Sequence, residues 1–96
     1  MGGLGLVPGA NFGENCAVFE AVHGSAPDIA GKGLANPTAL LLSAILMLRH
    51  LGKNDVADRV QQAISHVYDE GRHLTRDVGG GVTTEEFTSD VIDTLK

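Results

Sequence analysis

Two short apolar runs separated by polar residues occupy the first quarter of the chain. Residues 3–8 are apolar and end in a Pro-Gly pair, which predicts a buried strand running into a turn. Residues 11–15, Asn-Phe-Gly-Glu-Asn, have the composition of a loop. Residues 16–22 are apolar apart from Glu20, and they predict a second buried strand that leads into a glycine-rich segment at residues 23–37.

The longest apolar stretch predicts a helix over residues 37–51. Asn36 is a good N-cap residue, and Pro37 suits the first helical position because it has no N–H to leave unpaired. Gly52 suits the left-handed turn that ends a helix. The stretch is apolar on nearly every face until its last turn, so we expect a helix that is buried on most of its sides.

Residues 54–71 have the 3.6-residue period of an amphipathic surface helix. Asn54 is placed to cap the start of this helix and Gly71 to end it. The apolar residues that share one stripe are Val56, Val60, Ala63, Ile64 and Val67. The polar residues that fall elsewhere are Asp55, Asp58, Arg59, Gln62 and Asp69. Tyr68 lies beside the apolar stripe, where we expect it to pack.

The last quarter predicts a short extended piece at residues 73–78, a glycine loop at residues 79–81 and a closing helix. Thr83, followed three residues later by Glu86, has the signature of a capping box. The apolar residues on one face of the closing helix are Phe87, Val91, Ile92 and Leu95. The resulting order, β-β-α-α-(β)-α, indicates part of an α/β layer structure.

The predicted elements do not complete a domain. Two or three short strands do not form an independent sheet. A helix that is apolar all round also needs more cover than a chain of 96 residues supplies. The pattern therefore predicts a piece of a larger α/β structure.

Charge and composition exclude several classes of partner. The net charge is −5 and no basic cluster is present, which argues against binding to nucleic acid or an anionic membrane. The apolar run at residues 39–48 is well short of the roughly 18 residues that span a bilayer, and no secretory leader is readable. Cys16 is the single cysteine, so an internal disulfide is excluded, which fits a reducing compartment.

The glycine-rich segment at residues 23–37, His-Gly-Ser-Ala-Pro-Asp-Ile-Ala-Gly-Lys-Gly-Leu-Ala-Asn-Pro, is too rich in small residues to fill a core. It is not a P-loop, because its Gly-Lys pair is followed by Gly33 and Ala26 stands where the first glycine is required. Residues 3–9 do not form a Rossmann fingerprint either, because the glycine spacing is wrong and no helix follows.

The residues of this segment leave two interpretations open. In the first, small residues let the backbone approach an adenosine closely, and glycines permit the unusual dihedral angles required. His23 then offers an imidazole, Asp28 accepts both hydrogen bonds of a ribose diol, and Asn36 pairs with an adenine edge. In the second, the segment is a tight surface loop in which Asn36 only caps its helix and Asp28 is solvated.

Residues 2–52 and 75–92 resemble the C-terminal third of the β-decarboxylating dehydrogenases, the isocitrate and isopropylmalate dehydrogenase family. The motif His-Gly-Ser-Ala-Pro-Asp-Ile-Ala-Gly-Lys-Gly-x-Ala-Asn-Pro is highly specific, and the likeness covers essentially the whole chain. It is greatest to NAD-dependent isocitrate dehydrogenase subunits of the mitochondrial type, with isopropylmalate dehydrogenase next. The resemblance implies that residues 1–96 are an incomplete, C-terminal portion of one large domain without a Rossmann fold, beginning within that domain.

The resemblance also implies a coenzyme site and a reaction. Members of the family oxidise a 2-hydroxy acid with NAD and release CO₂, with the help of Mg²⁺ or Mn²⁺. Glu20 and the expected turn at residues 8–11 match positions beside the nicotinamide ribose. The residues that match the adenosine-binding part of the site are His23, Gly24, Ser25, Ala26, Asp28, Ile29 and Asn36.

Asp28 and Ile29 bear on the choice of coenzyme. They stand where NADP-using relatives tend to place a Lys and a Tyr for the 2′-phosphate. A carboxylate accepts a hydrogen bond from the free 2′-hydroxyl of NAD and repels a phosphate. These residues therefore favour NAD.

The remaining functional groups of the family lie upstream of the region matched here. They are the substrate-binding arginines, the acid/base Tyr and Lys, and the metal-binding aspartates, so we expect no catalytic residue and no metal ligand in this chain. His50, His66 and His73 have no ligand spacing. The acidic residues expected to be solvated surface charges are Asp55, Asp58, Asp69, Glu70, Glu85 and Glu86.

Several functions remain to be weighed. The first is the coenzyme-adenosine-binding part of an NAD-dependent isocitrate dehydrogenase, which forms 2-oxoglutarate and CO₂ as a homo- or hetero-oligomer. The alternatives are an isopropylmalate dehydrogenase fragment and a regulatory, nucleotide-binding subunit, although the intact motif favours a catalytic one. A stand-alone binding module is disfavoured, because nothing in the chain hides the apolar helix. The expected location is the mitochondrial matrix in a eukaryote and the cytoplasm otherwise.

Overall fold

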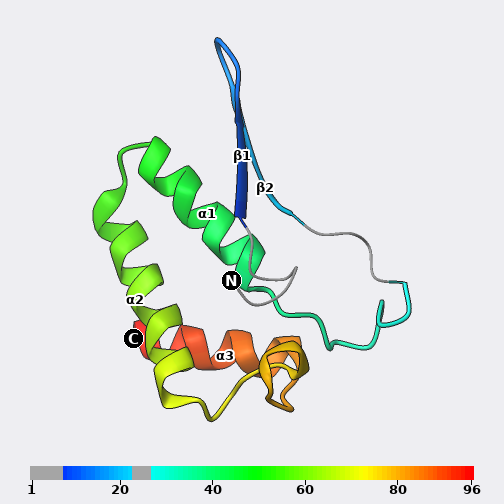
Figure 1. Ribbon diagram of the computed structural model, residues 1–96. Coiled ribbons are helices and arrows are strands. Elements are labelled where there is room, and N and C mark those ends of the chain that lie inside the picture. Colours follow the sequence, from blue (N-terminus) through cyan, green and yellow to red (C-terminus); the bar gives the residue numbers. More distant parts are fainter. Residues whose placement is uncertain (1–7, 23–26) are drawn as a thin grey trace.

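A computed structural model describes residues 8–22 and 27–96 of the chain. A hairpin of two strands rises along the first helix, the second helix lies beside the first, and the third crosses below them (Figure 1). In chain order the elements are β1 (Pro8–Phe12), β2 (Ala17–Ala21), α1 (Thr38–His50), α2 (Asn54–Glu70), the 3₁₀ turn η2 (Arg76–Val78) and α3 (Thr84–Leu95). The described part of the chain is thus a mixed α/β piece.

The hairpin corrects the prediction for residues 8–12. The expected turn and the first loop residues form strand β1, which pairs antiparallel with β2 from Pro8 opposite Ala21 to Phe12 opposite Ala17. Proline at the first position of a strand loses no ladder hydrogen bond, so the Pro-Gly pair did not mark a turn here. The rest of the strand predicted at residues 3–8 lies outside the described residues.

The prediction of a second strand is confirmed, but the prediction that this strand is buried is wrong. Exposure alternates along β2, and Val18 on its outer face is 55% exposed. The hairpin packs against α1, and β2 turns one face toward cover and the other to the outside. In β1 the first three residues are half-buried and the last two are exposed.

Helix α1 is confirmed and ends at His50, and Gly52 shortly after it has the expected left-handed conformation, with a φ of +79°. The helix begins at Thr38, one residue later than predicted, and Pro37 is its N-cap. The described chain leaves α1 partly uncovered, as expected for an apolar helix that needs more cover than 96 residues supply. Leu40 and Leu51 are each 61% exposed, because only the hairpin and α2 cover the helix.

Helix α2 ends as predicted at Gly71, which has a φ of +70°. Its start differs, because Lys53 is the N-cap and Asn54 is already helical. Val56 is 46% exposed, whereas Ala57 is fully buried. Position 57 continues, by three or four residues, the spacing of the half-buried position 60 and the buried positions 64 and 67, and position 56 points to the side of that stripe.

Helix α3 begins with the predicted capping box. Thr83 Oγ1 accepts from the Glu86 N–H at 3.1 Å, and Glu86 Oε1 accepts from the Thr83 N–H at 3.2 Å. Phe87 and Val91 are buried as expected, but Ile92 is 46% exposed. The predicted extended piece is wrong at residues 76–78, where the chain forms the turn η2 before the left-handed Gly79.

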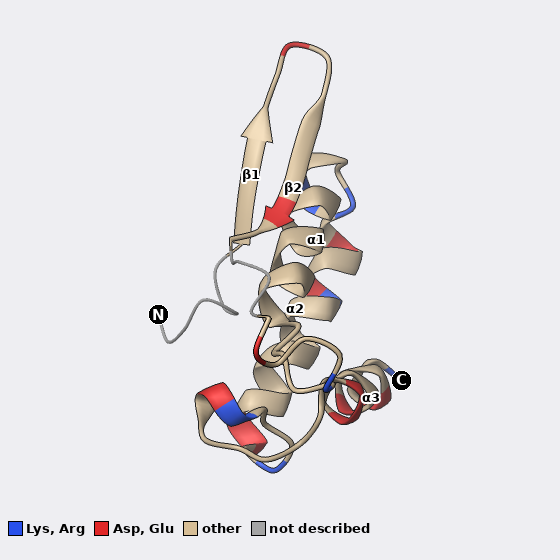
Figure 2. Ribbon diagram, turned by 90° about the vertical axis from the view of Figure 1, so that its right-hand side faces the viewer, with Lys and Arg blue, Asp and Glu red and all other residues tan. Residues whose placement is uncertain are grey.

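The core lies between the three helices. The residues that form it are Ile45, Ala57, Ala63, Ile64, Val67, Phe87 and Val91. Acidic residues are found on α2 and α3, and the hairpin carries few charged residues (Figure 2). The hydrophobic cluster therefore holds the helices to one another, while the hairpin extends beyond it.

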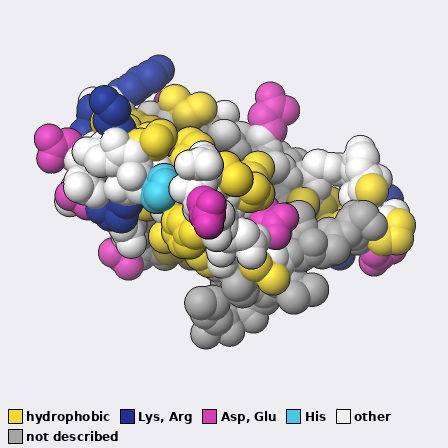
Figure 3. Space-filling model, turned by 90° about the horizontal axis from the view of Figure 1, so that it is seen from above, with side chains coloured by type: hydrophobic (Ala, Val, Ile, Leu, Met, Phe, Trp, Pro, Cys, Tyr) yellow, Lys and Arg dark blue, Asp and Glu magenta, His cyan; other side chains and the backbone are white. Residues whose placement is uncertain are grey.

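An apolar surface surrounds the hairpin and α1, with large hydrophobic side chains between charged ones on the face seen in Figure 3. The most exposed of them are Phe12, Val18, Leu40 and Leu51, at 68%, 55%, 61% and 61%. Among the described residues the sheet has two strands, so both of its edges are open. Open edges and apolar patches favour association.

We therefore expect the isolated 96-residue chain to self-associate or to lack a cooperative unfolding transition. Analytical ultracentrifugation combined with thermal melting followed by circular dichroism measures both properties. Phe12→Ser with Leu40→Ser should reduce association, whereas Asp55→Ser with Asp58→Ser on α2 is a matched polar control that should not. A monomer with a sharp two-state melt would show that the apolar surface is tolerated.

Candidate functional site

The described part of the glycine-rich segment, residues 27–37, consists of turns at residues 27–33 and an irregular stretch that leads to the start of α1 (Figure 1). The Lys32 N–H donates to the Ile29 carbonyl at 3.2 Å. Gly31 and Gly33 have φ values of +80° and +68°, which a residue with a side chain rarely adopts. Glycine is therefore required at both positions by the backbone path.

The residues expected to bind adenosine are only partly within the described chain. His23, Gly24, Ser25 and Ala26 lie outside the described residues. Asp28 is exposed and Ile29 is half-buried. The carboxylate of Asp28 is thus accessible to a ligand.

The end of the segment is fixed to the start of α3. The Thr84 N–H donates to the Gly33 carbonyl at 2.7 Å, and Thr84 Oγ1 donates to the Ala35 carbonyl. The second of these hydrogen bonds joins residues 49 positions apart in the sequence. The last part of the segment therefore rests on the helical core, whereas Asp28 lies on its exposed part.

Asn36 is buried, and its side-chain amide makes hydrogen bonds in every available direction. Oδ1 accepts from the N–H and the hydroxyl of Thr38, at 3.0 and 2.6 Å. Nδ2 donates to the hydroxyl of Tyr68 at 3.0 Å and to Oδ2 of Asp77 at 3.1 Å. The prediction that Asn36 is the N-cap of α1 is wrong by one residue, because Pro37 is the N-cap and makes no side-chain capping bond. Asn36 Oδ1 instead accepts from the N–H of Thr38, the first helical residue.

Sequence reasoning missed Tyr68 and Asp77 as partners of this segment. Tyr68 does pack, with its ring centroid 5.7 Å from that of Phe87, but its hydroxyl also reaches Asn36. No spacing rule connects these positions, which are 32 and 41 residues from Asn36. The one available signal was a tyrosine, in place of a fully apolar residue, beside the buried stripe of α2.

The residues matched to the nicotinamide side lie together on the hairpin. Gly9 of β1 is directly opposite Glu20 of β2, so residues 8–11 adjoin Glu20 as strand partners and not as a turn. The Glu20 carbonyl accepts from Ser43 Oγ of α1 at 2.8 Å, and its side chain is exposed. The carboxylate is thus held on a strand that is fixed to α1.

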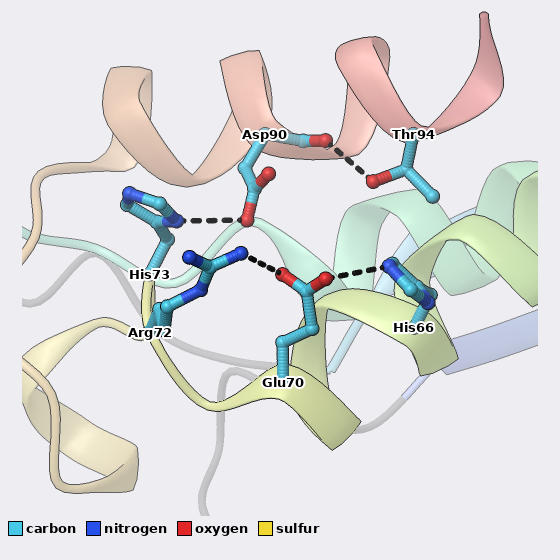
Figure 4. A network of polar contacts seen from close by, with 6 residues as sticks. All are labelled: His66, Glu70, Arg72, His73, Asp90 and Thr94. Atoms are coloured by element: carbon cyan, nitrogen blue, oxygen red, sulfur yellow. Dashed lines mark hydrogen bonds and ion pairs between the residues drawn. The ribbon is translucent and has the colours of Figure 1, made fainter.

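Polar contacts around the end of α2 and on α3 involve two other histidines, His66 and His73 (Figure 4). Glu70 receives hydrogen bonds from Arg72 at 3.1 Å and from His66 at 2.9 Å. The hydrogen bond from Arg72 is the main cause that lowers the pKa of the Glu70 carboxyl. His73 Nδ1 lies 3.0 Å from Asp90 Oδ2, and the Asp90 carbonyl accepts from Thr94.

These contacts are those of surface charges. All six acids expected to be solvated are exposed. Within residues 8–22 and 27–96, no group of three or more potential metal ligands comes together. None of the helices in that same part of the chain combines the length and hydrophobicity needed to cross a membrane.

The hairpin, the three helices and the glycine-rich segment held against them form a mixed α/β unit. Over residues 1–94 the sequence matches the isocitrate/isopropylmalate dehydrogenase family. The chain belongs to that family.

Individual relatives show which members of the family the chain is similar to. The chain is 57% identical over 99% of its length to the Arabidopsis thaliana mitochondrial isocitrate dehydrogenase [NAD] catalytic subunit 5, and covers 26% of that protein. It is 56% identical over its whole length to the Thermus thermophilus isocitrate/homoisocitrate dehydrogenase, and covers 28% of it. The crystal structure of the TT0538 protein from Thermus thermophilus superposes with a TM-score of 0.96 at 51% identity, over 99% of this chain and 20% of that one. This chain thus spans about a quarter of the length of the curated relatives that it matches.

Proposed function

We propose that this chain is the C-terminal, coenzyme-adenosine-binding part of an NAD-dependent isocitrate dehydrogenase, which converts isocitrate to 2-oxoglutarate and CO₂. The observation that carries the proposal is the 57% identity to a protein named as a catalytic subunit of this enzyme. The motif at residues 23–37 is intact in the sequence, which favours a catalytic over a regulatory subunit. Residues 1–96 then form an incomplete portion of one domain, in the mitochondrial matrix of a eukaryote or the cytoplasm of a bacterium.

The adenosine half of NAD is proposed to bind along residues 23–36. Asp28 accepts from the ribose hydroxyls, and its exposure leaves both carboxylate oxygens available. His23 and Asn36 lie near the adenine. Because the side-chain amide of Asn36 is fully bonded within the protein, it contributes to this part of the site by fixing the backbone around it.

The reaction also needs groups that we place outside this chain. A divalent cation, Mg²⁺ or Mn²⁺, supplies Lewis-acid chemistry at the 2-hydroxy acid in this family, and the described residues offer no cluster of ligands to hold it. We assign to this chain the binding and orientation of the coenzyme, with Glu20 on the nicotinamide side.

The isolated chain is expected to form no NADH from isocitrate, isopropylmalate or homoisocitrate. Hydride transfer from the 2-hydroxy acid needs a positioned proton acceptor and a cation, and we assign neither to these residues. Absorbance at the NADH band, with metal and substrate in excess, measures this.

A hybrid enzyme tests whether the chain supports NAD-dependent catalysis when the groups placed outside it are supplied. In it, these 96 residues replace the matching segment of the Thermus thermophilus isocitrate/homoisocitrate dehydrogenase. The hybrid should oxidise isocitrate with NAD, and AMP should compete with NAD. Turnover by the isolated chain, or a hybrid in which AMP and NAD do not compete, would contradict the proposed function.

A further inference from the structure

Three side chains at the start of α1 and the end of α2 form a closed ring of hydrogen bonds. Asn36 Oδ1 can only accept, so the hydroxyl proton of Thr38 must be donated to it, at 2.6 Å. Tyr68 accepts from Asn36 Nδ2 at 3.0 Å, and its hydroxyl lies 2.7 Å from Thr38 Oγ1. Since the one proton of Thr38 is already used, the Tyr68 O–H is the donor in that contact.

The orientation of Asn36 in this ring is fixed. Its Oδ1 also accepts from the Thr38 backbone N–H at 3.0 Å, so a reversed amide would place two donors against each other. The second proton of Nδ2 goes to Asp77, whose other oxygen accepts from the fully buried Thr75. The ring is thus attached through η2 to the core.

The hydroxyl of Tyr68 completes the ring, and packing alone does not require it. The aromatic ring of Tyr68 packs against Phe87, a contact that phenylalanine at position 68 would also make. Loss of the hydroxyl removes the acceptor of one Nδ2 proton and the donor to Thr38, in a region where unpaired polar groups are costly. The side chain therefore has a polar role that its place beside the apolar stripe does not explain.

We propose that Tyr68 is a positioning residue for the coenzyme segment: its hydroxyl holds Asn36, and through it the adenosine-binding backbone, in the geometry that binds NAD. This inference rests on the proposed function. Asn36 directly follows the residues that Thr84 fastens to α3, so the ring is the second of two supports for the end of the segment. Tyr68 acts on NAD through Asn36 and needs no contact with the coenzyme.

The test compares Tyr68→Phe with the parent hybrid enzyme. The KM for NAD and the inhibition constant of AMP should both rise about three- to tenfold, because Tyr68→Phe removes two hydrogen bonds of a partly buried network and their loss reaches NAD only through Asn36. The kcat, the KM for isocitrate and the inhibition constant of nicotinamide mononucleotide should stay unchanged. Thr94→Val is the matched control, because it removes a hydroxyl that bonds only within α3.

Thr38→Val tests the same ring from its other side. Thr38→Val should also raise the KM for NAD and the inhibition constant of AMP. In the double variant with Tyr68→Phe, the rise in each constant should be smaller than the product of the rises in the two single variants. Thr38→Ser, which keeps the hydroxyl, should restore NAD binding. Thermal melting of each variant registers any loss of stability separately from NAD binding.

The outcomes separate this inference from the proposed function. Absence of competition between AMP and NAD in the parent hybrid contradicts the proposed function itself. Competition that Tyr68→Phe and Thr38→Val leave unchanged overturns the positioning role alone. The positioning role is also overturned if the variants weaken the binding of AMP and of nicotinamide mononucleotide equally, or if kcat falls as well. Either result would mean that Tyr68 supports the fold in general.

Discussion

Asp28→Lys combined with Ile29→Tyr is expected to erode or reverse the preference of the hybrid enzyme for NAD over NADP. Asp28 is exposed on the proposed coenzyme segment, where its carboxylate accepts from the 2′-hydroxyl of NAD. The 2′-phosphate of NADP removes that donor and adds a charge near −2 beside the carboxylate. Each loss is worth about 1–3 kcal/mol in a partly desolvated site, which corresponds to a tenfold to hundredfold preference.

The measurement is kcat/KM with each coenzyme. The KM for isocitrate should not move, because these residues face the coenzyme. Asp28→Asn is the matched control, since it removes the repulsion without adding a cation and should weaken NAD binding with little gain for NADP. Equal use of both coenzymes by the parent hybrid, or no shift in the double variant, removes Asp28 from this role.

The helices could be predicted from the sequence because their signals are local. The capping box of Thr83 and Glu86, the left-handed Gly52 and Gly71, and most of the apolar stripe of α2 follow from neighbouring residues. The strand at residues 8–12 could not be predicted in the same way. Its Pro-Gly pair has the local composition of a turn, and its extended form depends on pairing with β2.

The same distinction applies to the candidate site. Asp28 and Asn36 could be proposed as site residues because they belong to one contiguous motif. Tyr68 and Asp77 could not be, because their contacts with Asn36 depend on how α2 and η2 pack against the start of α1. Local sequence thus identifies the groups proposed to meet the ligand, and tertiary packing adds the groups that hold them.

Phe87→Ala is expected to destabilise the hybrid enzyme by about 3–5 kcal/mol, the usual cost of truncating a buried phenylalanine. The Phe87 side chain is fully buried and lies in the core cluster against α2. Its ring also supports Tyr68, so the truncation should raise the KM for NAD as well as lower the free energy of unfolding. Urea unfolding followed by circular dichroism measures the first effect, and steady-state kinetics the second.

Two control variants separate core packing from substitution on α3 in general. Phe87→Leu keeps most of the apolar volume and should cost less than about 1.5 kcal/mol, with little change in the KM for NAD. Ile92→Ala removes a side chain on the same helix that is 46% exposed in this chain, and should cost less than Phe87→Ala. If Phe87→Ala costs no more than Ile92→Ala, Phe87 is not the centre of this core. If stability falls but the KM for NAD does not, the packing of Phe87 on Tyr68 does not reach the coenzyme segment.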